Sequence, residues 1–193
     1  MKFKYHKYRE MMLAAIVASL RRVQPEIEKI PFPPNPLIKD RPISGIAVYL
    51  MPGDRFGLYF RSWEEMHEIK YSLGDWEHQF FFAEGEVPEI DVAQEYCASL
   101  LEHLDEDEEA SQAVVNLAYI ATAEALLDPV VTQELTSLSI EARGCFGGIA
   151  PEGVERMVFN EYGDVSGVFN YCEHVSLNRY LKSAMRRSSW WRL

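Results

Sequence analysis

The chain has 193 residues, a length that suits one domain better than two. Its 48% hydrophobic and 25% charged residues are ordinary values for a globular protein and exclude a disordered chain. A net charge of -11 disfavours nucleic-acid binding, because each phosphate contact needs a cation. The absence of any run of about 18 apolar residues disfavours a membrane span.

The cysteine pattern predicts a protein of the reducing cytoplasm. Cys97, Cys145 and Cys172 lie far apart, form no CxxC pair and are odd in number, so they cannot all be bridged within one chain. A disulfide scaffold is therefore not expected.

The segment 1–24 is predicted to contain an amphipathic helix that covers about Tyr5–Val23. Apolar side chains recur at Leu13, Ile16, Val17 and Leu20, and Pro25 should stop the helix. A secretory signal is the alternative for this basic and then apolar stretch, but arginines follow the apolar run at once. Residues 25–42 hold six prolines and are expected to be an extended crossover.

The next segments predict a hairpin, a helix and a third strand. Residues 43–51 and 56–61 flank the turn sequence Pro-Gly-Asp-Arg. Ser62 and Glu65 have the spacing of a capping box at a helix start, and residues 76–83 then predict a strand.

The second half predicts helices and then another hairpin. After an acidic loop at 84–91, helices are expected at 92–104 and 109–127, and a shorter one from Asp128-Pro129 to about Ser137. Residues 154–160 and 165–171 predict the second hairpin, and 177–187 a final helix capped by Ser176. We therefore expect a single α+β domain, with a mainly antiparallel sheet built from two hairpins and helices packed on one face.

Charge is segregated along the chain. Residues 1–22 and residues 179–193 each carry a local charge of +5, whereas residues 71–142 contain 17 Asp or Glu and no Lys or Arg. The basic ends are expected to fold onto this acidic middle, because opposite charges attract.

The densest acidic residues are the first candidate site. They are either a solvated surface that keeps the protein soluble or a surface that docks a basic partner protein. The candidate partner-binding residues are Glu84, Glu86, Glu89, Asp105, Glu106, Asp107, Glu108 and Glu109.

A second candidate site would make the protein an enzyme. Glu64-x-x-His67 has the spacing that di-iron helices use, and Asp75-x-x-His78 repeats it, which suggests a metal-dependent or other hydrolase. A two-metal centre needs ligands from several facing helices, so we expect solvated helix polarity instead, with no metal, no cofactor and no catalysis.

Two smaller features each have a structural and a functional interpretation. Cys145, between glycines and beside Arg143, could be a nucleophile with His174 or His78 as base, but a small buried thiol is the expected role. Trp190-Trp191, flanked by arginines, predicts packing onto the domain or across a homodimer interface, rather than a membrane contact.

The order of these elements carries a resemblance. The first hairpin leading into Ser62-Trp63-Glu64-Glu65, then residues 71–77, two helices and a late hairpin resemble small bacterial domains of unknown function, some of them similar to immunity proteins that neutralise toxins. The resemblance implies a non-enzymatic binding protein and transfers no catalytic residue. A hydrolase and an oligomer-forming structural protein remain the alternatives.

Overall fold

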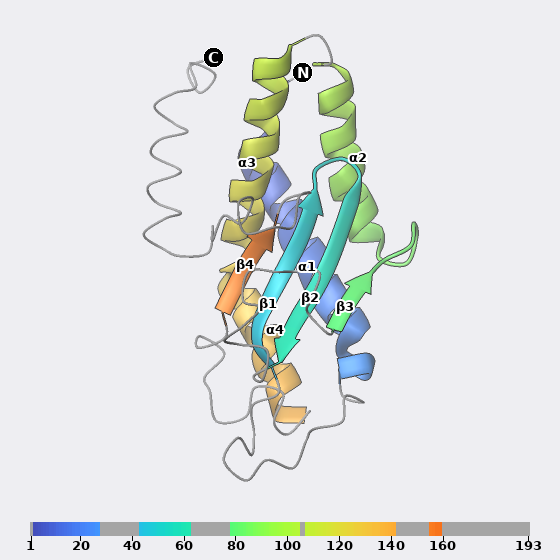
Figure 1. Cartoon of the computed structure of the whole chain (residues 1–193), viewed down its shortest axis with the longest axis vertical. Coiled ribbons are helices and arrows are strands. Elements are labelled where there is room, and N and C mark those ends of the chain that lie inside the picture. Colours follow the sequence, from blue (N-terminus) through green and yellow to red (C-terminus); the bar gives the residue numbers. More distant parts are fainter. Residues whose placement is uncertain (1, 28–42, 63–77, 105–106, 142–154, 160–193) are drawn as a thin grey trace.

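The computed structural model describes residues 2–27, 43–62, 78–104, 107–141 and 155–159 (Figure 1). These residues form four helices and four strands. In chain order they are α1 (Tyr5–Ile27), β1 (Ile43–Met51), β2 (Arg55–Ser62), β3 (His78–Phe81), α2 (Pro88–Glu102), α3 (Glu108–Leu126), α4 (Pro129–Glu141) and β4 (Glu155–Phe159).

The strands form one sheet in the order β3-β2-β1-β4. Strands β1 and β2 are the predicted first hairpin, and β3 joins β2 in antiparallel fashion, so the α+β class is confirmed. Strand β4, however, runs parallel to β1, with Ala47 opposite Met157. It arrives after three helices, and a long crossover of this kind allows parallel pairing. The sheet is therefore mixed, and the predicted partner strand at 165–171 lies outside the described residues.

All four helices lie on one side of the sheet, behind it in Figure 1. The strands alternate as a half-covered sheet requires: Ile46, Val48 and Leu50 of β1 belong to the buried core, as do alternate residues of β2. The helices contribute the other half of the same core. Their buried side chains include Tyr8, Met12, Ile16, Leu20, Val23, Cys97, Val114, Ala118, Ile120 and Leu126.

Helix α1 is longer than predicted. It continues through Pro25 to Ile27, although the proline cannot donate the hydrogen bond expected at its position. Ile27 is fully buried in the core, as is nearly all of Val23. Burial of these side chains at the helix end offsets the lost bond, so packing overrides the local proline preference.

Helix α2 also begins earlier than predicted, at Pro88 instead of Val92. Pro88 occupies the first turn, where no backbone N–H is needed, and Glu89 and Asp91 stand at the positive end of the helix dipole. The sequence interpretation treated these residues as an acidic loop, whereas they are helix-start signals. The predicted Asp128-Pro129 start of α4 is confirmed, and α4 runs on to Glu141.

The turn between β1 and β2 is anchored to α2. Gly53 has a left-handed φ of +85°, and its N–H donates to Oε1 of Gln94 at 2.8 Å. A Cβ at this position would lie only 3.0 Å from the backbone Cα of Ala98. Gly53 therefore serves both the turn conformation and the close approach of sheet and helix.

We predict that Gly53→Ala lowers the free energy of unfolding by about 2 kcal/mol, because it adds a steric clash to an unfavourable backbone conformation. Gly85→Ala is the matched control: Gly85 has a φ of +80°, but nothing lies within 4 Å of its added Cβ. The control should lose about 1 kcal/mol, from the backbone alone. Denaturant unfolding measures both, and equal losses would show that the approach to α2 carries no energy.

Candidate functional site

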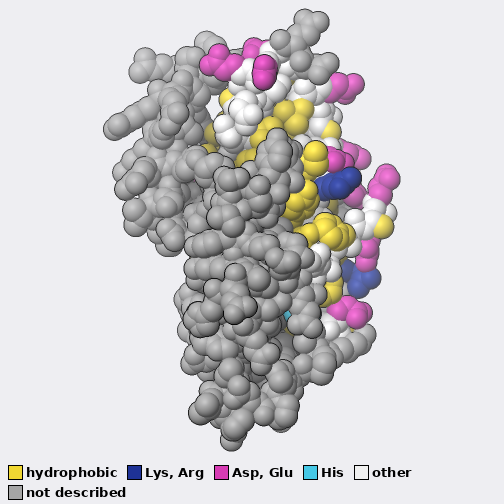
Figure 2. Space-filling view, in the orientation of Figure 1, with side chains coloured by type: hydrophobic (Ala, Val, Ile, Leu, Met, Phe, Trp, Pro, Cys, Tyr) yellow, Lys and Arg dark blue, Asp and Glu magenta, His cyan; other side chains and the backbone are white. Residues whose placement is uncertain are grey.

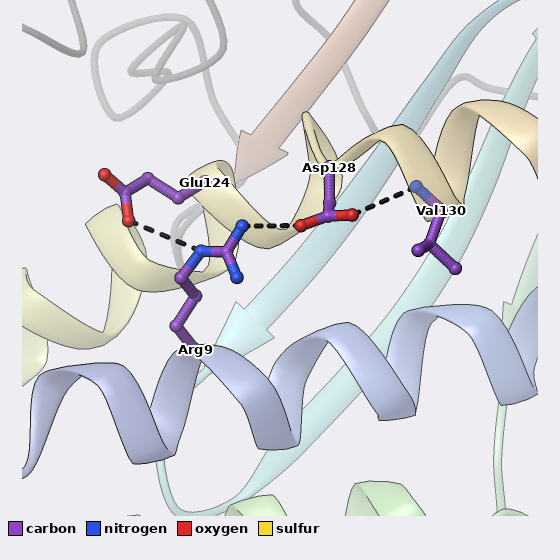
Figure 3. A network of polar contacts seen from close by, with 4 residues as sticks. All are labelled: Arg9, Glu124, Asp128 and Val130. Carbon is purple, nitrogen blue, oxygen red and sulfur yellow. Dashed lines mark hydrogen bonds and ion pairs between the residues drawn. The ribbon is translucent and has the colours of Figure 1, made fainter.

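Helix α1 brings its basic residues to the acidic half of the chain. Arg9 lies between α3 and α4: its Nη2 donates to Asp128 at 2.6 Å, and its Nε is 3.6 Å from a carboxylate oxygen of Glu124 (Figure 3). Each of the three side chains is less than a third exposed, so water screens the network less than it would a surface pair.

Two further arginines on α1 do the same at its other end. Arg21 binds Glu134 of α4 through Nε, at 3.1 Å, and through Nη2. Arg22 reaches Glu86, before α2, with its Nη2 at 2.6 Å. The expectation that the basic amino-terminal segment folds onto the acidic middle is thus confirmed for its three arginines, and residues 179–193 lie outside the described part.

Asp128 has two roles at the bend between α3 and α4. Its Oδ1 accepts a hydrogen bond from the N–H of Val130, which caps α4, while Oδ2 accepts from Arg9 (Figure 3). Burial acts to raise the pKa of Asp128, but the bond from Val130 and the bond and charge of Arg9 together hold the pKa below its usual value. The side chain is therefore charged whenever the protein is near neutral pH.

The predicted acidic surface separates into two groups at opposite ends of α2. Helix α2 has 15 residues, so the groups are separated by about 20 Å along its axis. One group lies before and at the start of the helix, with Glu84, Glu86 and Glu89 exposed. The other lies where α2 ends and α3 begins; Asp105 and Glu106, between them, are outside the described residues.

One carboxylate of the group at the start of α2, and one just beyond the group, are bound within the protein. Glu86 pairs with Arg22 and also accepts from the N–H of Ala83 at 3.1 Å. The neighbouring Asp91 accepts from the N–H of Gly85 at 2.8 Å. Two of the carboxylates here therefore fix the chain that enters α2.

The second group, which we term the acidic tip, consists of Glu102, Asp107, Glu108 and Glu109. All four are exposed. Asp107 caps α3 by accepting from the N–H of Ala110 at 3.0 Å, and Glu108 and Glu109 occupy the first turn of that helix. Among the described residues no Lys, Arg or His pairs with these carboxylates. Figure 2 shows acidic side chains over this end of the molecule, at the top of the view, and others along its right edge.

The alternative metal-binding residues lie mostly outside the described part of the chain. His78 lies half-buried in β3, where it is paired with Phe60, while Glu64, His67 and Asp75 lie outside the described residues. So do Cys145, His174, Trp190 and Trp191. Within the described part of the chain, no group of three or more His, Cys, Asp or Glu side chains could hold a metal ion.

Sequence reasoning missed a buried polar cluster where α1, α2 and α3 meet. Burial raises the pKa of Tyr8 well above its usual value, with Cys97 and Tyr119 adding to the effect and Thr122 opposing it. Burial likewise raises the pKa of the Cys97 thiol to about 12. Both groups stay protonated at neutral pH, so Cys97 is no nucleophile. The apolar spacing of α1 and α2 could have predicted that Tyr8 and Cys97 are buried, but not which side chains surround them.

No family model, no curated protein and no solved structure matches this chain. The geometry described above therefore carries the functional argument by itself. No single helix among the described residues is long and apolar enough to cross a membrane, although α3 and the start of α4 meet that test together as a bent pair.

The Asp128 network predicts a specific dependence of stability on pH. Because the folded-state pKa of Asp128 is lowered, its contribution is complete above the unfolded-state pKa of about 3.9 and is lost as pH falls through the folded value. Asp128→Asn keeps an acceptor for the N–H of Val130 but removes this charge.

The variant should lose about 1 kcal/mol at pH 7. Below about pH 4 its stability should fall less steeply than that of the parent protein. Glu10→Gln, at an exposed position on α1, controls for the change in net charge. Parallel pH profiles of parent and Asp128→Asn in urea unfolding would contradict the assignment.

Proposed function

We propose that this protein is a non-enzymatic acidic binding protein, similar in role to an immunity protein, and that its acidic tip engages a basic surface of a partner protein. One observation carries the proposal. Arginines of α1 neutralise Glu86, Glu124, Asp128 and Glu134, whereas the tip carboxylates have no cationic partner among the described residues.

The shape of this end supports the proposal. The end of α2 and the start of α3 extend beyond the β1–β2 turn (Figure 1). An acidic end of this kind suits a basic cleft, such as one built for phosphate groups, because complementary charge speeds encounter and selects the partner.

Unpaired carboxylates also carry a cost that a partner would relieve. Adjacent like charges repel one another, and within the described part of the chain only the positive end of the α3 dipole compensates Glu108 and Glu109. A cationic surface would remove this repulsion when it binds. Residues that served solubility alone would not need to be concentrated at one turn.

The test compares two variants with the same change in charge. The tip variant carries Glu102→Gln, Glu108→Gln and Glu109→Gln and leaves the Asp107 cap in place. The control variant carries Glu84→Gln, Glu89→Gln and Glu95→Gln, at exposed positions before, at and beyond the start of α2. The probe is a synthetic peptide rich in Lys and Arg, and calorimetry measures its affinity over a range of salt concentrations.

We expect the tip variant to bind about tenfold more weakly at low salt, and the control variant to change about half as much. The difference should vanish as salt increases, because screening removes the Coulomb contribution. Equal affinity of the tip variant and the parent protein at low salt, or an affinity that ignores salt, would overturn the proposal.

A further inference from the structure

The segment that precedes α1 is held against α2 by one side chain. The N–H of Lys4 donates to the hydroxyl of Tyr96 at 2.8 Å. Phe3 packs on the same ring, with centroids 6.1 Å apart, and on Tyr8, at 5.3 Å. Lys7 places its Nζ 5.2 Å from the centre of the Tyr96 ring. Residues 2–4, which we term the strap, are therefore docked rather than trailing.

The strap carries positive charge toward the acidic tip. Lys2 and Lys4 of the strap are exposed, as is Lys7 in the first turns of α1, and none of the three forms an ion pair within the described residues. Tyr96 and Glu102 are six residues apart on α2, which places the docking point about 9 Å along the helix from the tip. Because the screening length is about 8 Å at physiological salt and about 30 Å at 0.01 M, charge docked at Tyr96 should act on the tip weakly at the first salt concentration and more strongly at the second.

We propose that the strap is a built-in competitor: while it is docked on Tyr96, its lysines reduce the attraction of the acidic tip for a basic partner, and its release increases that attraction. The effect on partner affinity rests on the proposed function, whereas the docking of the strap on Tyr96 does not. The docked strap also indicates which kind of segment suits this side of α2: one in which lysines flank an aromatic residue.

Charge-neutral substitutions separate the strap from the charge that it carries. Phe3→Ala removes the ring that packs on Tyr8 and Tyr96, and Tyr96→Phe removes only the acceptor for the N–H of Lys4. Phe81→Ala is the matched control, because Phe81 is 57% exposed on β3 and contacts the sheet aromatics Tyr49 and Tyr59.

The first measurement is the rate at which trypsin cleaves the full-length protein after Lys2 and Lys4. Docked backbone is protected from proteases, so Phe3→Ala should be cleaved several-fold faster than the parent protein, Tyr96→Phe at an intermediate rate, and Phe81→Ala at the parent rate. Equal rates for Phe3→Ala and the parent would overturn the docked strap.

The second measurement is the affinity of each variant for the same Lys- and Arg-rich peptide. Phe3→Ala should bind about threefold more tightly at 0.01 M salt, where the screening length is about 30 Å, and show little gain at 0.15 M. Faster cleavage with unchanged affinity would overturn the competition. If tip neutralisation also left affinity unchanged, the proposed function itself would fail, whereas the cleavage result would still decide whether the strap is docked.

Discussion

The buried stripe of helix α1 is the constraint on which the rest of the structure depends. Its core residues recur every three or four positions, from Tyr5 and Tyr8 through Met12 to Ile27, so one continuous face is buried along 23 residues. Helices α2, α3 and α4 all contact α1, and the sheet contributes its inner face to the same core. Because each large apolar side chain contributes roughly 1.5–3 kcal/mol when fully buried, this one stripe accounts for much of the packing energy. Burial of Val23 and Ile27 also stabilises the helical turn that contains Pro25.

This arrangement also decides how charge is distributed in the folded protein. Once its apolar stripe is fixed, α1 presents Arg9 to the bend between α3 and α4, Arg21 to α4 and Arg22 to the start of α2. These pairs join segments that are far apart in sequence, and the partly buried Arg9 network also satisfies the cap of α4. The exposed pair of Arg21 contributes little to stability, as is usual for surface ion pairs. The arginines therefore mainly change where negative charge remains: they neutralise four carboxylates of the acidic middle along α1, whereas the tip carboxylates have no cationic partner among the described residues.

Local patterns predicted well what depends on local physics. The first hairpin follows from its turn residues, α3 from its apolar periodicity, and the start of α4 from Asp128-Pro129. The errors are non-local: the end of α1 depends on what covers Ile27, and the direction of β4 depends on the route taken by α2 to α4. The candidate site shows the same division. Sequence alone located the acidic residues, but only the fold distinguishes Glu86, which Arg22 neutralises, from Glu108 and Glu109, which have no described cationic partner.

That distinction changes what the net charge of -11 means. Spread evenly over the surface, it would act as a weak repulsive field that opposes aggregation. Here the arginines and the caps use particular carboxylates in structural roles, and the tip carboxylates, where α2 meets α3, have no cationic partner among the described residues. A field of this kind falls off within a screening length and therefore acts on whatever docks directly at the tip, not on distant molecules. The lysines of the strap lie near that limit, so docking and release of a few residues can adjust the attraction without altering the fold. The fold sets the position of the charge, and under the proposed competition the strap would set how much of it a partner encounters.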